Sequence, residues 1–145
     1  MAKRRKKPRS GVESPTSDCV LLCDDVLISQ GKNKHSLVGV IGTIAVAGFP
    51  AVIGGYVSYV RLSNVYSGGQ KISLRLSSAK NDETIMEAET GLPVQSDPLG
   101  VYTFITPLPL FQITEEGRYL FGVYHNGVPI ATSAILVQGP AEEKQ

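Results

Sequence analysis

Two adjacent carboxylates, Asp24 and Asp25, form the pair of side chains whose spacing most directly suggests chemistry. Neighbouring carboxylates can act as general acid and base, or can bind Ca²⁺. They interrupt an apolar run that we expect to form a strand over 20–28, and adjacent residues of a strand point to opposite faces. The two carboxylates therefore do not converge on one site, and we predict that a bulge or a strand end exposes both.

The cysteines and histidines lack the pattern of a metal centre. Cys19, Cys23 and His35 do not have zinc-site spacing, and no second Cys/His pair completes a tetrahedral site around His125. On one face of a strand, the two cysteines would lie about 13 Å apart, which is beyond the reach of a disulfide. We predict free thiols in a reducing, cytoplasmic setting, with no metal and no cofactor.

Motifs of common catalytic and nucleotide-binding sites are missing from the sequence. It contains no G-x-S-x-G elbow, no G-x-x-x-x-G-K-[ST] phosphate loop and no G-x-G-x-x-G fingerprint. We therefore assign no catalytic residue and predict a protein that is not an enzyme. An enzyme of unidentified type is the least favoured alternative.

The start of the chain is strongly basic. Its six cationic side chains, which we predict to bind nucleic acid, are Lys3, Arg4, Arg5, Lys6, Lys7 and Arg9. From residue 10 onward, eight basic and thirteen acidic side chains give a net charge of −5. Such an arm suits a polyanion: DNA, RNA or an acidic surface. A solubilising tail without a dedicated partner is an equally open interpretation.

Composition divides the chain into three parts. Residues 1–17 are basic and then rich in Ser, Pro and Gly, so they cannot bury apolar surface and are predicted to be disordered. Residues 18–139 are predicted to form one β-sandwich domain, and 140–145 form a short charged tail. No apolar segment follows the basic residues, so we expect no secretory signal.

The stretch over 37–60 contains no charged side chain and is long enough to cross a membrane as a helix. Five glycines and Pro50 interrupt it, and β-branched residues are frequent in it. We expect two buried strands, at about 36–46 and 55–63, and keep a transmembrane helix as the less favoured alternative.

Asn126-Gly127 predicts a hairpin near the C-terminus, because this dipeptide best tolerates the two positive φ angles of a type I′ turn. Pro129 has no N–H to donate, so the last strand should begin at a sheet edge or a bulge. Ile135 and Val137 fall on the less apolar face, which indicates a bulge near Ser133 or burial of both faces. The predicted cross-strand pairs are His125–Val128, Tyr124–Pro129, Val123–Ile130, Phe121–Thr132 and Tyr119–Ala134.

Strict alternation over 71–76 predicts a half-exposed strand, with Lys71 and Arg75 on its outer face. These two cations are the next candidates for a polyanion site if the arm does not bind.

Tyr59 and Arg61 could stack on a base, although packing is the favoured use of Tyr59. About seven or eight short strands separated by Gly and Pro turns predict an all-β fold, an antiparallel, immunoglobulin-like β-sandwich.

Several segments resemble a family of small bacterial proteins of unknown function. They are Cys23-Asp24-Asp25-Val26, Gly31-x-x-Lys34-His35-Ser36-Leu37-Val38-Gly39-Val40, Pro50 with Tyr59-Val60-Arg61-Leu62, and Gly117-x-Tyr119-x-Phe121 with Asn126-Gly127. The resemblance covers about residues 18–139. It implies a compact β-sandwich in a bacterial, non-secreted setting, without an assigned activity, and it brings no functional residue.

Two functions from different classes follow. The first is a non-enzymatic binding or structural module, whose sheet edges serve self-association or the addition of a partner's strand. The alternative is a self-assembling, coat-like shell protein whose basic arm binds nucleic acid. In both cases we expect a chain that starts at Ser17 to lose polyanion binding.

Overall fold

The computed structural model describes residues 15–29, 34–64, 71–90, 93, 95–96 and 100–141. These residues form twelve strands and no helix, so the predicted all-β class is confirmed. The stretch over 37–60 contributes to four of the strands, and no helix long and apolar enough to span a membrane occurs in the described part. These residues therefore form strands, and not the helix of the less favoured alternative. The basic residues up to 14 lie outside this description.

One antiparallel sheet has five strands. In spatial order they are β2 (Lys34–Val40), β1 (Thr16–Ser29), β5 (Val57–Ser63), β9 (Tyr102–Pro107) and β8 (Gln95–Ser96). β1 begins four residues before the strand that the sequence predicts, because Thr16 and Ser17 already pair with β5. Thr16 and Ser17 therefore belong to the first strand.

A second five-stranded sheet contains the C-terminal hairpin. In spatial order its strands are β3 (Thr43–Ala45), β12 (Val128–Gln138), β11 (Gly117–His125), β6 (Ile72–Ser78) and β7 (Thr84–Glu89). β3 pairs in parallel with the end of β12, and the other pairs are antiparallel. A small third sheet joins β10 (Phe111–Ile113) to β4 (Ala51–Ile53).

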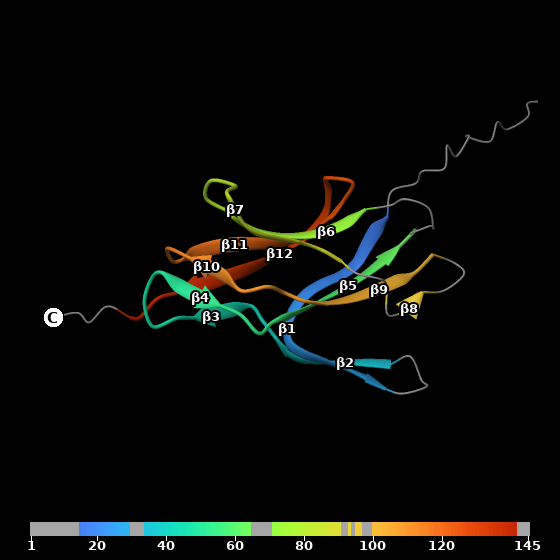
Figure 1. The fold of residues 1–145 in the computed structure, drawn as a ribbon, viewed down its shortest axis with the longest axis horizontal. Coiled ribbons are helices and arrows are strands. Elements are labelled where there is room, and N and C mark those ends of the chain that lie inside the picture. Colours follow the sequence, from blue (N-terminus) through green and yellow to red (C-terminus); the bar gives the residue numbers. More distant parts are fainter. Residues whose placement is uncertain are drawn as a thin grey trace, which may run out of the picture.

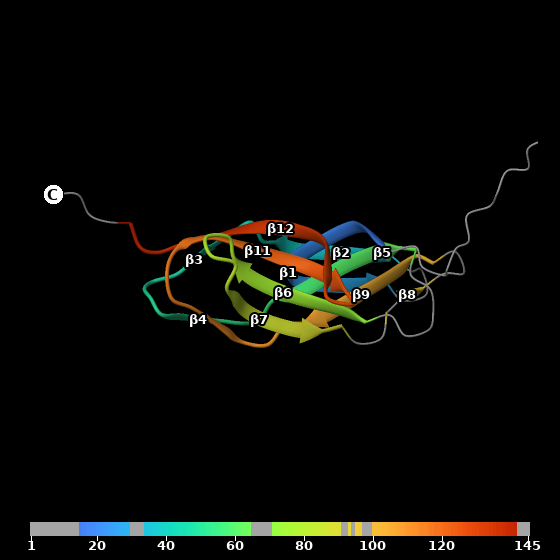
Figure 2. The same ribbon diagram turned by 90° about the horizontal axis from the view of Figure 1, so that it is seen from above.

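The core lies between the two five-stranded sheets, which Figure 1 shows as layers and Figure 2 shows from above. Along β6, Ile72, Leu74 and Leu76 are buried, whereas Ser73 and Arg75 are only partly buried. This confirms the inward and outward positions predicted for the strand. The sheet that contains β1 contributes Val20, Leu22, Val60, Leu62 and Phe104 to the core.

The predicted hairpin turn is confirmed. Asn126 and Gly127 have φ angles of 51° and 84°, as a type I′ turn requires. The first two predicted pairs, His125–Val128 and Tyr124–Pro129, are also found. β3 pairs only with the end of β12, from Leu136 onward. The start of β12 therefore forms a sheet edge among the described strands, as the position of Pro129 predicted.

A bulge at Ile130 changes the rest of the hairpin register. The predicted pairs Val123–Ile130, Phe121–Thr132 and Tyr119–Ala134 are wrong; the observed ones are Val123–Ala131, Phe121–Ser133 and Tyr119–Ile135. The bulge lies three residues before the predicted position. Its physical effect is to place Ile135 and Val137 on the core face, where both are buried.

We predict that Phe121→Ala lowers the free energy of unfolding by about 3–5 kcal/mol, because it leaves a cavity in a close-packed core. The Phe121 side chain is fully buried between the sheets. Val52→Ala is the control, since Val52 is 67% exposed and its truncation should change stability little. Equilibrium unfolding in urea measures both. Equal effects of the two substitutions would contradict this assignment of the core.

Candidate interaction surface

β1 changes its partner along its length, and this change positions the candidate surface. From Thr16 to Cys23 it pairs with β5, and from Cys23 to Ser29 it pairs with β2. Asp24 and Asp25 lie at the change and both are exposed, as the sequence predicted. Because these polar residues end the core-facing run, the rest of β1 forms a hairpin with β2 that lies below β5 and β9 in Figure 1.

The hairpin of β1 and β2 packs on the outer face of β5. His35 Nδ1 lies 2.8 Å from the Tyr59 hydroxyl, and the two rings meet edge to face. Tyr59 and its hydrogen-bond partner Thr103 are both buried. This confirms the predicted packing role of Tyr59, because a buried ring cannot stack on a base. Arg61 instead pairs with Asp18, at 3.7 Å.

The other face of this hairpin is exposed, and it carries apolar side chains beside Asp25 and Ser36. Leu27, Val38 and Val40 are 54%, 44% and 51% exposed. In the register of the hairpin, Val38 lies opposite Asp25 and Leu27 lies opposite Ser36, so these side chains share one face. Among the described strands, β2 has a neighbour on one side only. An unpaired edge beside apolar side chains offers both backbone groups and apolar contacts to another strand.

The prediction of a buried strand over 36–46 is wrong for β2. In this strand only His35 and Leu37 are partly buried, and the remaining residues are exposed. The physical reason is that β2 pairs with the part of β1 that has left the core. Its polar residues could have signalled this, because a strand buried on both faces is apolar throughout.

The other described sheet edges are short or carry features that discourage pairing, and the edge strands β3, β4 and β10 have three residues each. β7 presents the charged Glu87 and Glu89, and β8 has two residues. The edge of β12 contains Pro129 and a bulge, and Ser133 Oγ there donates a hydrogen bond to the backbone of β1. Charge, proline, bulges and short length are the usual protections of sheet edges. β2 has seven residues and no proline, and its one charged side chain is Lys34 at its start.

Gly39 allows a carboxylate to lie across β2. It has a φ of +64°, which favours glycine, and a Cβ at this position would collide with the side chain of Asp24. The Asp24 carboxylate from β1 therefore lies over Gly39, beside the free edge. The C-terminal end of β2 thus lies beside a negative charge from β1, whereas its first residue is the cation Lys34.

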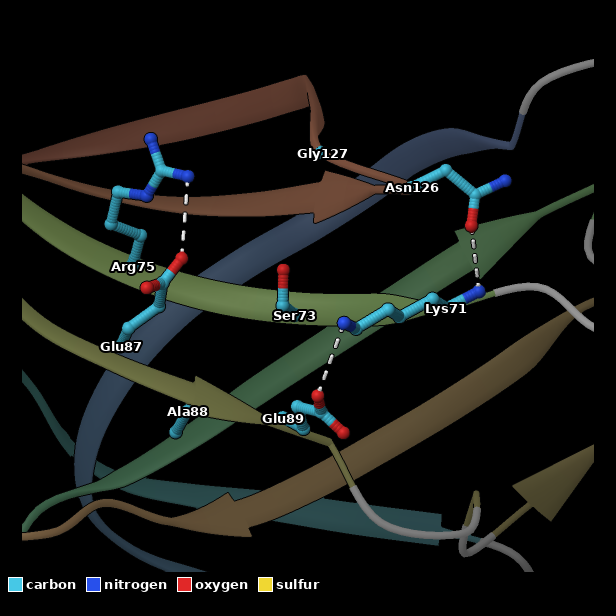
Figure 3. Close-up of a pocket in the computed structure, with 8 residues that line it drawn as sticks. All are labelled: Lys71, Ser73, Arg75, Glu87, Ala88, Glu89, Asn126 and Gly127. Carbon is cyan, nitrogen blue, oxygen red and sulfur yellow. Dashed lines mark hydrogen bonds and ion pairs between the residues drawn. The ribbon is translucent and has the colours of Figure 1, made fainter.

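A shallow groove beside β6 and β7 holds the two cations considered for polyanion binding (Figure 3). Lys71 Nζ lies 3.4 Å from Glu89, and Arg75 Nη2 lies 3.3 Å from Glu87. The Arg75 guanidinium also lies over the ring of Tyr124, 4.1 Å from its centre. Each cation is thus paired with a carboxylate, so this groove does not present the free positive charge that attracts a nucleic acid.

The remaining predicted residues are placed as follows. Cys19 and Cys23 are free thiols, as predicted, and burial raises the pKa of both, which disfavours the reactive thiolate at neutral pH. Within the described residues, no three His, Cys, Asp or Glu side chains are grouped so as to hold a metal ion. The predicted nucleic-acid-binding residues lie outside the described part: Lys3, Arg4, Arg5, Lys6, Lys7 and Arg9.

We predict that Tyr59→Phe lowers the free energy of unfolding by about 0.5–1.5 kcal/mol at neutral pH, because the hydrogen bond to His35 is lost. Burial raises the pKa of Tyr59. The unfolded chain therefore releases this proton first, and the stabilisation is present below pH of about 10 and declines above it.

Urea unfolding at neutral and alkaline pH measures both effects. The Tyr59→Phe protein should lose less stability than the unsubstituted chain on going to high pH. An equal or larger loss in the variant would contradict the assigned environment of Tyr59.

Comparison with known proteins gives a family and no activity. No match is found among curated proteins. Residues 18–138 match a family of unknown function, DUF6941. This segment coincides closely with the 18–139 over which the sequence resembles an uncharacterised family, although the bacterial setting stays a prediction. Because the match covers most of the length of the chain, the chain belongs to this family of unknown function, DUF6941.

Proposed function

We propose that this protein is a non-enzymatic binding module, an immunoglobulin-like β-sandwich that accepts an extended strand from a protein partner along β2. The observation that carries the proposal is the edge of β2, which no other described strand pairs, beside the exposed Leu27, Val38 and Val40. In strand addition, main-chain hydrogen bonds supply affinity, and contacts with alternate side chains supply specificity. The partner strand should therefore have apolar residues at alternate positions.

The immunoglobulin-like part of the proposal has its own support. The Tyr119 hydroxyl donates a hydrogen bond of 2.6 Å to the carbonyl of Glu115, four residues upstream. A tyrosine near the start of a late strand that bonds back to the preceding corner is typical of immunoglobulin-like sandwiches. The two stacked five-stranded sheets are consistent with the same architecture.

We predict that Val38→Lys abolishes capture of the partner by the full chain in an affinity purification from native cells. A lysine within an edge strand disfavours strand addition, and Val38 is exposed enough to accept it without loss of fold. Val52→Lys is the matched control, because Val52 is also exposed but belongs to β4 in another sheet. If both variants retain the same proteins as the unsubstituted chain, β2 is not the binding edge.

We further propose that the basic arm at residues 3–9 binds polyanions. The support is the charge distribution of the part that the structure describes, which contains six basic and nine acidic side chains. Four of those six cations pair with carboxylates: Arg61, Lys71, Arg75 and Lys80. The described surface therefore offers little free positive charge, and the arm is the better candidate.

Replacing the six basic residues of the arm by glutamine should abolish the weak binding of DNA or RNA at low salt. Six phosphate contacts imply a log–log salt slope of about −4 to −5, because each contact releases counterions. Substitution is preferable to a chain that starts at Ser17, since Pro15 is buried and Thr16 pairs with Ser63. Titrations of labelled oligonucleotides at several salt concentrations measure this.

Equal affinity of the two proteins would exclude the arm. Size-exclusion chromatography of the same mixtures distinguishes the binding module from the alternative function, a self-assembling shell. A large particle that forms only with RNA would favour the coat-like shell over the binding module.

A further inference from the structure

We propose that the strand which pairs with β2 is β2 of a second copy, so that the protein forms a two-fold symmetric dimer through antiparallel β2 strands. This inference rests on the binding edge in the proposed function and names its partner. A two-fold interface is self-complementary, because each surface element meets the same element of the other copy. Antiparallel pairing of one strand with its own copy satisfies this condition.

Charge complementarity is the first argument for a second copy. Lys34 lies at the start of β2, whereas Asp24 and Asp25 lie beside its end, next to Gly39 and Val38. All three charged side chains are exposed, and none has an ion-pair partner among the described residues. An antiparallel pair brings the Lys34 end of each copy to the carboxylates of the other, so the contact occurs twice.

The apolar side chains give the second argument. Leu27, Val38 and Val40 lie on the solvent-facing side of the hairpin. In the antiparallel pair, residues that face each other across the strands share one side of the sheet. The exposed apolar side chains of the two copies therefore lie on the same side of the joined sheet, near the two-fold axis. Val38 and Val40 lie in the edge strand itself, whereas Leu27 lies one strand further from the other copy.

The position of Gly39 is the third argument. Its positive φ and the Asp24 carboxylate above it place negative charge at the end of the edge strand rather than inside β1. The far end of β2, where Lys34 pairs with Ser29, has a cation instead. Parallel pairing of two β2 strands would bring like charges together, so the charge pattern selects the antiparallel arrangement.

Sedimentation equilibrium of the full chain over a concentration series tests the dimer. Lys34→Glu should weaken dimerisation by about tenfold, because two attractive contacts become repulsive. The double substitution Asp24→Lys and Asp25→Lys should weaken it similarly. Combining all three changes should restore dimerisation, because the charges are exchanged rather than removed.

Lys80→Glu is the matched control, since it changes the net charge equally but lies in the turn between β6 and β7. It should leave the dimer intact, and far-ultraviolet circular dichroism should show that all variants are folded. A chain that is monomeric at every concentration overturns the inference. So does a dimer that responds equally to Lys34→Glu and Lys80→Glu, or one that the combined exchange fails to restore.

The two proposals can fail separately. A monomeric chain that still loses a captured protein on Val38→Lys overturns the dimer and supports binding of another protein at β2. A chain whose oligomeric state and captured proteins are both unaffected by Val38→Lys overturns both proposals.

Discussion

An edge strand has backbone N–H and C=O groups on one side that no neighbouring strand pairs. The need to protect or pair these groups explains much of the present structure. β8 limits the unpaired row by its short length, and β7 places glutamates beside it. On β12, a proline and a bulge disturb the row before another strand could use it. β2 has a longer row with one lysine at its start. The contrast with the protected edges makes β2 the distinctive surface of the described residues.

The exposed edge follows from the way β1 is divided. Val20 and Leu22 direct the first half of β1 into the core, and Asp24 and Asp25 end that pattern. The second half must still pair its backbone, and it does so with β2. A two-stranded hairpin is marginal by itself. Packing on β5, where His35 meets Tyr59, fixes its position and leaves the opposite face exposed.

Local chemistry explains which parts of this fold could be predicted from sequence. The Asn126-Gly127 turn and the alternation along β6 depend on few neighbouring residues, so both could be predicted from the sequence. The bulge at Ile130 shifts the hairpin register so that Ile135, and not Ala134, pairs with Tyr119 and is buried. This choice of register depends on packing against the opposite sheet, which is distant in the sequence. The candidate surface was missed for a similar reason. Val38 and Val40 have apolar side chains, and only the departure of β1 from the core exposes them.

The basic arm precedes β1 in the sequence, whereas β2 pairs with the last residues of β1, so the two proposals concern different parts of the chain. The arm precedes Thr16, whereas β2 pairs with the residues that lead to Ser29. A dimer formed through β2 carries two arms on one particle. Once one arm has bound a long polyanion, binding of the second becomes intramolecular and is governed by an effective concentration. Dimerisation through β2 would thus strengthen electrostatic binding by the arms, without a new contact between protein and polyanion.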